Sequence, residues 1–399
     1  MLIVARFFLG FGIPFAIAGA SQLLSELCYP KERAVISGLF HESWYAGSVL
    51  AAGVTLGTFN MDSDWSWRLP TLFQVVPSIL QLSFIWFVHP NNIFHSFRST
   101  GHTDISCRFI PESPRFLIAK DRHEEARAIL IKYHAEGDEN SPLVLAEYQE
   151  ICEAIAAEKQ ASTQPWKELF TARNNVRRVL IAIGVGLFAQ WSGNGLVSYY
   201  LAKVLETIGI TSRLRQNQIN LGLMCWNLCT GIAGSFVQHW VKRRTQWLTA
   251  FTGMTIVYAC WTASSAVYAG DNTNEHASRA VVALIFVYYG MYNLMMPLAY
   301  VYITEVFPYL QRSKGMGIML IFSRFGSAFN AFVNPIGLKA IEWRMYIVYT
   351  CWLAIETTYI FFVYPETFGL SLEEASDAVN GSAHRSKKPL DKLDGEDNA

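Results

Sequence analysis

The sequence predicts an all-α membrane protein with about nine transmembrane helices, and three observations support this fold class. Hydrophobic residues make up 52% of the 399 residues and charged residues only 16%, so the chain is more apolar and less charged than a typical soluble domain. Apolar windows of about 20 residues recur along the chain, and this is the length that a helix needs to cross the hydrocarbon core. Lys and Arg gather in alternate connections between the windows, as they do in cytoplasmic loops.

Each window is expected to form one membrane-spanning helix. The first contains Arg6 and has no small-residue cleavage site behind it, so it is interpreted as a span and not as a signal peptide. The predicted spans lie near residues 1–26, 34–57, 69–88, 178–206, 218–241, 247–269, 279–304, 315–336 and 345–364.

Charge and periodicity divide the chain into five segments. Residues 1–88 hold three spans and residues 178–366 hold six. Between them, 89–110 is a polar insertion, and whether it is a true loop or a retained intron is left open. Residues 111–177 have apolar and charged residues at helical spacing, which predicts a helical linker on the cytoplasmic side. The tail, 367–399, is almost free of apolar residues from about 382 and is expected to be disordered there.

Several chemistries find no support in the sequence. The seven Cys residues have no CxxC pair, so neither a disulfide framework nor a metal site is predicted. The formal net charge is zero, which gives no indication of nucleic-acid binding. A nucleophile elbow, HExxH, a P-loop and a Gly-rich dinucleotide string are all missing from the sequence. We therefore expect neither an enzyme nor a cofactor.

Three short strings at the ends of spans are more specific than composition. They are "PESPRFL" at 111–117, "YITEVFPYLQRSKG" at 302–315 and "PETFGLSLEEA" at 365–375. Together they resemble the sugar porter family of the major facilitator superfamily, and "GLFHESWYAGSVLAA" resembles its lactose-permease-like fungal branch. "RFFLGFG" followed by "SELCYPKER" resembles the fourth span of that family and the loop after it. The resemblance implies a twelve-span helical bundle, so we expect a chain truncated at its N-terminus and inactive in transport in that form.

The resemblance also implies a network of ion pairs at the cytoplasmic helix ends, which holds the inward gate shut and releases it on opening. Interfacial snorkelling and cytoplasmic positive charge are the alternative explanation. Two departures from the family pattern are His239 and Lys242 before the paired arginines, and Phe368 where Lys is usual. The matching positions are Glu26, Arg33, Glu112, Arg115, Arg243, Arg244, Glu305, Arg312 and Glu366.

The sugar site implied by the resemblance lies at mid-membrane, where a polar side chain needs a partner such as a substrate hydroxyl. Helix–helix hydrogen bonding and plain core packing are the alternatives left open. Ala189 and Gly195 stand where relatives carry amides, and Glu42 is an ionisable group inside a span. The candidate sugar-binding residues are Gln190, Asn194, Tyr199, Tyr200, Asn227, Tyr300 and His41, with Asn293, Ser323, Arg324 and Asn330 as undecided neighbours.

These expectations lead to a functional hypothesis. The chain transports a sugar, either a hexose or a disaccharide such as lactose, by alternating access in the plasma membrane, as a monomer embedded in the lipid bilayer. Protons are a candidate second substrate, but coupling is left open because the acidic residue that serves it in the family lies on the first span. A non-transporting sugar sensor is the alternative, although a sensor would signal through a longer tail than this one.

Overall fold

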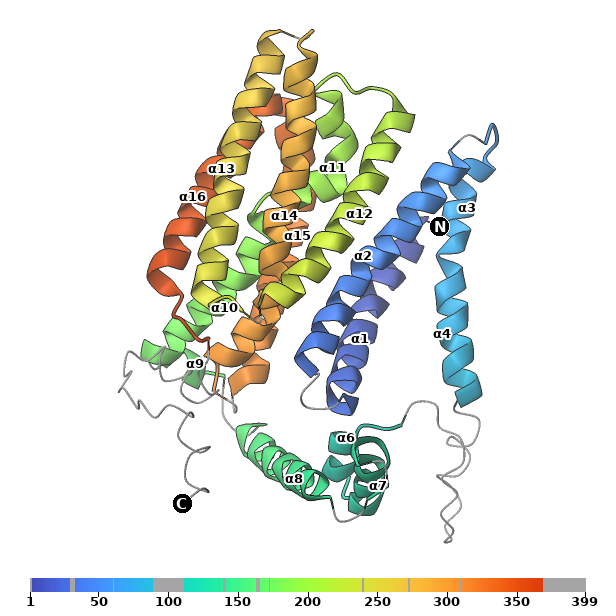
Figure 1. Ribbon diagram of the computed structural model, residues 1–399, viewed down its shortest axis with the longest axis vertical. Helices are drawn as coiled ribbons and strands as arrows, with labels where there is room; N and C mark the ends of the chain where they lie inside the picture. The colour runs from blue at the N-terminus through green and yellow to red at the C-terminus, as the bar shows by residue number, and fades with distance from the viewer. Residues whose placement is uncertain are drawn as a thin grey trace, which may run out of the picture.

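The computed structural model describes residues 2–28, 33–59, 61–88, 111–135, 137–138, 141–162, 166–171, 173–238, 240–271, 273–308 and 311–368. Every regular element within these ranges is a helix (Figure 1). The predicted insertion at 89–110 and the tail beyond Phe368 lie outside the described residues.

Four helices, named here the front helices, precede the linker. They are α1 (Leu2–Leu27), α2 (Arg33–Thr58), α3 (Trp65–Phe73) and α4 (Val75–Val88). The predicted third span is therefore two helices that meet at Gln74. Proline explains the break, because Pro77 has no N–H to donate to the carbonyl of Phe73 and its ring crowds that carbonyl.

The linker is helical, as the sequence predicts. It consists of α6 (Pro114–Ala119), α7 (His123–His134), α8 (Pro142–Ser162) and the short α9 (Glu168–Thr171), and a small apolar core joins α6, α7 and α8. His134 connects this unit to the front helices. Its ring lies 2.6 Å from a carboxylate oxygen of Glu147 in α8 and 3.3 Å from the carbonyl oxygen of Leu27, the last residue of α1.

The remaining seven helices, named here the main bundle, begin at Arg173 rather than near 178. They are α10 (Arg173–Trp191), α11 (Asn194–Glu206), α12 (Arg213–Val237), α13 (Arg243–Gly270), α14 (Glu275–Val306), α15 (Arg312–Ile341) and α16 (Met345–Val363), with a 3₁₀ turn at Glu342–Arg344. The predicted fourth span is thus two helices, α10 and α11. Pro297 lies inside α14 without ending it.

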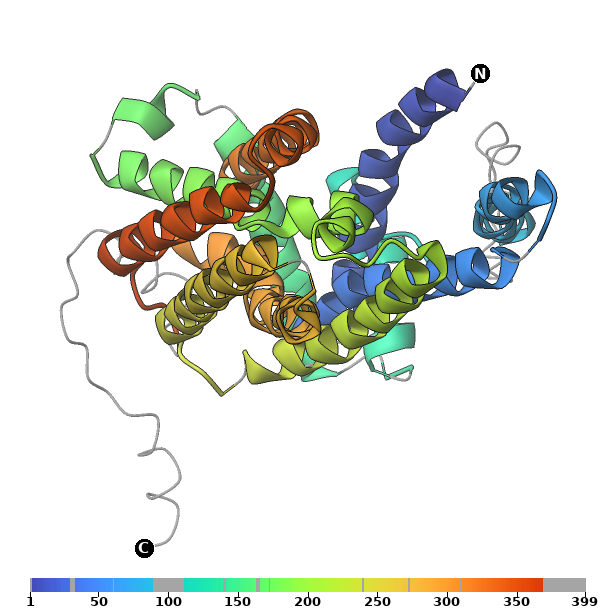
Figure 2. The ribbon, with the colours of Figure 1, turned by 90° about the horizontal axis from the view of Figure 1, so that it is seen from above.

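Figures 1 and 2 show how the two groups meet. The front helices stand beside the main bundle, and α2 packs along α12. Inside the main bundle the core is rich in aromatic rings, among them Trp247, Tyr258, Trp261, Tyr288 and Tyr292, all buried. The linker lies under one end of the helices, named here the linker end, at the bottom of Figure 1.

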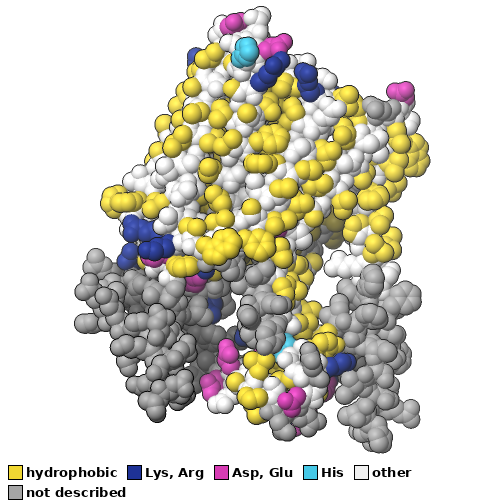
Figure 3. All heavy atoms as spheres, in the orientation of Figure 1, with side chains coloured by type: hydrophobic (Ala, Val, Ile, Leu, Met, Phe, Trp, Pro, Cys, Tyr) yellow, Lys and Arg dark blue, Asp and Glu magenta, His cyan; other side chains and the backbone are white. Residues whose placement is uncertain are grey.

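The surface of the bundle suits a lipid environment. On the face seen in Figure 3, hydrophobic side chains cover the sides of the helices, whereas Lys, Arg, Asp and Glu gather toward the two ends. Within the described residues, three stretches are long and apolar enough to cross a membrane: Asn174–Glu206, Glu275–Val306 and Arg312–Val363, the last of which contains α15 and α16. The predicted count of nine spans stays a prediction.

Candidate functional site

The candidate site is organised around the break between α10 and α11, at Ser192 and Gly193. Gly193 has a φ of +96°, a left-handed conformation that glycine adopts without strain. A Cβ at this position would collide with the phenol of Tyr258. The break interrupts the backbone hydrogen bonds of the helix, and each carbonyl that it leaves free needs another donor in a membrane.

Tyrosine hydroxyls supply these donors. The hydroxyl of Tyr292 donates to the carbonyl of Ala189 at 2.9 Å, and that of Tyr288 donates to Ser192 at 3.1 Å. Tyr258 donates to the carbonyl of Gly193 at 3.2 Å, and this carbonyl also accepts from the backbone N–H of Leu196 at 3.1 Å. The three carbonyls at the break therefore have donors, which come from rings of α13 and α14.

Gln190 lies on the last turn of α10 before the break, and its amide faces α15. Its Nε2 donates to the hydroxyl of Ser323 at 3.2 Å, and its Oε1 accepts from the hydroxyl of Ser327 at 2.8 Å. The amide of Asn330 donates to the backbone carbonyl of Gln190 at 2.6 Å. Two of the undecided neighbours, Ser323 and Asn330, thus belong to the environment of Gln190.

Asn194 is the first residue of α11, and its amide faces α14. It donates from Nδ2 to the hydroxyl of Tyr292 at 3.0 Å. Its Oδ1 accepts from Ser198 at 2.7 Å and from Tyr289 at 3.0 Å. The two predicted amides therefore flank the break, and the partner of each side-chain atom is a hydroxyl group.

The paired tyrosines follow one turn later on α11. Tyr199 is 62% exposed, while the hydroxyl of Tyr200 donates to the carbonyl of Ala331 in α15 at 2.9 Å. Tyr200 departs from helical geometry, with φ −129° and ψ 24°, so α11 bends at this pair. On α14, Tyr300 is exposed over about a third of its surface.

Asn227 takes part in a second polar cluster, between α12 and α14. The amide of Asn293 donates to the Oδ1 of Asn227 at 3.3 Å and to the hydroxyl of Thr230 at 2.8 Å. Tyr45 of α2 donates to the Oδ1 of Asn293 at 2.8 Å and so links the front helices to the main bundle. The side chain of His41 lies outside the described residues.

An ion-pair network lies at the linker end of the main bundle. Arg243 donates from Nε and Nη2 to the Oε1 of Glu305, at 3.2 and 3.1 Å. The backbone N–H groups of Arg243 and Arg244 donate to the two carboxylate oxygens of Glu366, at 2.9 and 3.2 Å. Thr367 donates to the other oxygen of Glu305 at 2.6 Å. The network thus ties the start of α13 and the end of α14 to the segment after α16.

Two rings extend the network. The guanidinium of Arg243 lies 5.5 Å from the ring centre of Phe368, and that of Arg244 lies 5.3 Å from Phe361. Both distances suit cation–π contacts. The ring of Phe368 therefore lies against Arg243, which a Lys at this position would repel.

The other predicted gate residues stand at or beside the ends of α1, α2, α6 and α15. Arg312 is the first residue of α15. Within the described chain, neither Glu112 nor Arg115, at the start of α6, forms an ion pair. The side chains of Glu26 and Arg33 lie outside the described residues.

The sequence reading missed several residues that the structure places at the site. The predicted amides bind the hydroxyls of Ser198, Ser327, Tyr289 and Tyr292. The carboxylate of Glu305 binds the hydroxyl of Thr367. The string "VYYGMYN" on α14 gave a signal, because tyrosines three or four residues apart share a helix face and a mid-span hydroxyl needs a partner.

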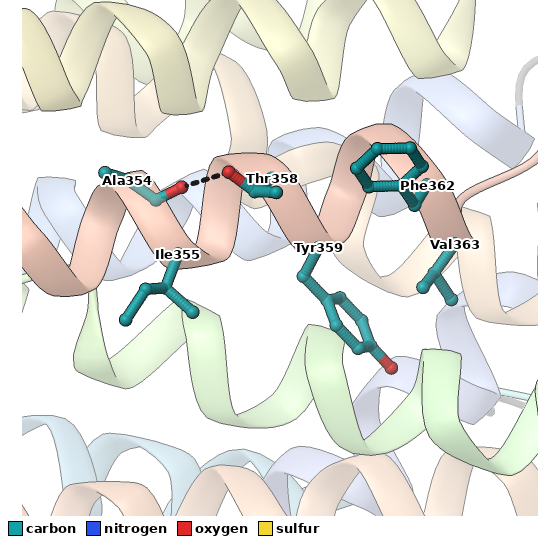
Figure 4. Close-up of a pocket in the computed structure, with 6 residues that line it drawn as sticks. All are labelled: Ala354, Ile355, Thr358, Tyr359, Phe362 and Val363. Atoms are coloured by element: carbon teal, nitrogen blue, oxygen red, sulfur yellow. Dashed lines mark hydrogen bonds between the residues drawn. The ribbon is translucent and has the colours of Figure 1, made fainter.

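A groove of about 480 Å³ lies elsewhere, on the outer face of α16. Its six lining residues all come from that helix, with Ile355, Tyr359 and Val363 along one side (Figure 4). The Tyr359 hydroxyl is already bonded to the carbonyl of Leu180 at 3.1 Å, and that of Thr358 to the carbonyl of Ala354 at 2.8 Å. Since no free polar groups converge there, the groove suits a lipid chain better than a polar substrate.

Comparison with known proteins identifies the family. The model of the sugar (and other) transporter family matches residues 1–92 and 104–378. The chain belongs to that family. Its members are multi-pass membrane transporters and not enzymes, in agreement with the sequence-based prediction.

Among its relatives in the sugar transporter family, the MFS-type transporter criB of Aspergillus cristatus is 28% identical over 378 residues, which cover 94% of this chain and 72% of criB. A high-affinity glucose transporter of Kluyveromyces lactis is 26% identical over 394 residues, which cover 94% of this chain and 67% of that protein.

Solved structures confirm the major facilitator fold. The proton:xylose symporter XylE bound to 6-bromo-6-deoxy-D-glucose aligns with a TM-score of 0.67 at 19% identity, over 90% of this chain and 69% of XylE. The inward-open form of XylE from E. coli aligns with a TM-score of 0.64 at 18% identity, over 90% of this chain and 68% of that one.

Proposed function

We propose that this chain moves a hexose-class sugar across the membrane by alternating access, with the sugar bound at the break between α10 and α11. The hydroxyl environment of Gln190 and Asn194 supports this proposal best. Each amide binds side-chain hydroxyls from a facing helix. A sugar hydroxyl is the same chemical group, so it can replace one of these partners without leaving a buried amide unsatisfied.

The exposed rings above the break extend the site. Tyr199 is open to contact, and a sugar ring stacks its C–H face on such an aromatic surface. The helix-end network then serves the conformational cycle by holding α13, α14 and the segment after α16 together, so that the main bundle moves as one body when the two groups of helices rock. The orientation that places the linker inside the cell follows from the positive charge of 242–244 and belongs to the proposal.

Uptake of labelled sugars tests the proposal. The 399-residue chain is expressed in cells that lack hexose transporters, and uptake of glucose, xylose and lactose is compared with sugar binding by the purified protein. This proposal departs from the expectation that the chain is inactive in transport in this form, and the uptake measurement decides between the two. If the proposal holds, a hexose is taken up, and both uptake and binding are lost in the double variant Gln190→Ala, Asn194→Ala. Gln216→Ala is the matched control, since this buried amide bonds a backbone carbonyl at the start of α12, away from the break.

Each alternative has its own outcome. Sugar binding without uptake favours the sensor, or a chain that needs further spans to transport. Uptake of lactose but not of a hexose replaces the proposed substrate by a disaccharide. If no sugar is bound or transported, the proposed function is wrong. We further propose that the protein works as a monomer in the plasma membrane. Light scattering of the protein in detergent measures its oligomeric state, and fluorescence microscopy of a tagged protein shows its location.

A further inference from the structure

Glu42 of α2 is a buried carboxyl group that the proposed sugar site does not use. Glu42 is only 2% exposed, and neither of its carboxylate oxygens has a hydrogen-bond partner among the described residues. It faces Gly231 of α12, where a Cβ would collide with the carboxyl, so the group fits only because that position is glycine. Glu42 therefore lies in the contact between the front helices and the main bundle.

Among the described residues, the groups that surround Glu42 offer it no cation. On its own helix, the neighbouring titratable side chain is Tyr45, whose hydroxyl is directed to Asn293. The α12 helix presents Gly231 with its neighbours Asn227 and Thr230, and α14 presents Asn293 together with Tyr289 and Tyr292. Arg6 of α1 is exposed, while the side chains of His41 and Glu26 lie outside the described residues. Glu305 of α14 is already paired with Arg243 at the linker end.

A buried ionised carboxylate that has no cation or hydrogen-bond donor beside it is strongly disfavoured, whereas the neutral acid is tolerated. The closed contact between α2 and α12 therefore retains a proton on Glu42. When the two helices separate, water reaches the group and the O–H bond can dissociate, giving carboxylate and a proton taken up by water. Separation of the helices is also the motion that the proposed transport cycle requires.

We propose that Glu42 is the proton-binding site of this transporter: it keeps its proton while α2 and α12 are in contact, and it exchanges the proton with water when they separate. This inference rests on the proposed sugar transport. It adds a coupling ion and assigns it to the contact between the two groups of helices, away from the hydroxyl-bound amides of the break. Only the O–H bond of the carboxyl forms and breaks, and the proton comes from water on one side and leaves to water on the other.

The chain contains a matched control. Glu356 of α16 is also fully buried, with one oxygen accepting from the indole N–H of Trp352 at 2.6 Å and the other without a partner among the described residues. Its helix packs on α10 and α13, inside the main bundle. Rocking of the two groups does not open that environment, so Glu356 should stay protonated throughout.

The first experiment needs no sugar. Infrared difference spectra of the purified 399-residue chain are recorded between acidic and alkaline buffer, and the band of protonated carboxyl groups is compared among the parent, Glu42→Gln and Glu356→Gln. We expect Glu42→Gln to remove a pH-dependent component of the band that Glu356→Gln leaves in place. An unchanged pH-dependent component in Glu42→Gln overturns the proposal. Glutamine imitates the neutral acid, so a Glu42→Gln protein that fails to fold also overturns it.

The second experiment uses proteoliposomes with an imposed pH gradient. We expect the parent chain to accumulate sugar above the external concentration, and Glu42→Gln to exchange labelled for unlabelled sugar without accumulating it. Glu356→Gln should accumulate sugar like the parent. Accumulation by Glu42→Gln, or equilibration without accumulation by the parent, refutes proton coupling at Glu42. Absence of exchange by the parent refutes sugar transport itself, so the two failures are distinguishable.

Discussion

The pair of Arg243 and Glu305 gives a prediction whose size follows from its geometry. Two N–H groups of Arg243 share one oxygen of Glu305, and the side chains are only 15% and 14% exposed. A hydrogen bond to a charged group contributes about 1.5–3 kcal/mol, whereas an exposed ion pair contributes about 0.2–1 kcal/mol. Since both hydrogen bonds share one acceptor and the pair is partly exposed to solvent, we expect a coupling free energy of about 2 kcal/mol.

A double-mutant cycle measures this coupling. The free energy of unfolding in detergent is followed by tryptophan fluorescence for the parent, Arg243→Ala, Glu305→Ala and the double variant. The control cycle uses Arg279 and Glu275, whose nitrogen and oxygen are 2.8 Å apart but whose side chains are 75% and 77% exposed. That pair should couple by about 0.3–0.5 kcal/mol. Equal coupling in the two cycles would refute the reasoning that partial burial strengthens the network.

Three further substitutions test other contacts. Gly193→Ala should lower the free energy of unfolding by about 1–3 kcal/mol, because alanine is strained at this φ and its Cβ would collide with the phenol of Tyr258. Gly317→Ala is the control and should leave the free energy of unfolding unchanged, because a Cβ there meets nothing within 4 Å. Gly231→Ala should lower the thermal midpoint by forcing α2 off α12, and adding Glu42→Ala, which removes the colliding carboxyl, should recover it. His134→Ala should speed tryptic cleavage of the linker, because its ring bridges α8 and the end of α1; unchanged cleavage would contradict that bridge.

Much of the helical architecture was predictable because length and hydropathy determine what can cross a membrane. The predicted windows coincide with α1, α2 and α12 to α16 within a few residues. The two misses are breaks inside windows. The first break is predictable from Pro77 alone, because proline lacks the backbone N–H that a helix needs at that position. The second depends on Gly193, and one glycine in an apolar window gives no sign of the three tyrosines that donate to carbonyls at the break.

The candidate site was predictable to the extent that motifs mark it. Gln190 and Asn194 were named from one string, and the structure places them on either side of the break. Apart from Ser198 on α11 itself, their side-chain partners come from α14 and α15, about 100 residues or more along the chain. Spacing within one helix carries no information on such distant contacts. The same limit applies to Glu42, whose isolation depends on Gly231 of a distant helix.

The tyrosine-capped break between α10 and α11 has a mechanical consequence. Because its carbonyls already have donors, α11 can change direction at Gly193 without unwinding either helix. The part of α11 from Asn194 to the bend at Tyr200 then forms an arm about 10 Å long, pivoted at Gly193. A swing of about 10° would move the tyrosine pair at the end of this arm by about 2 Å. Small rotations at the pivot would therefore reposition the exposed ring of Tyr199.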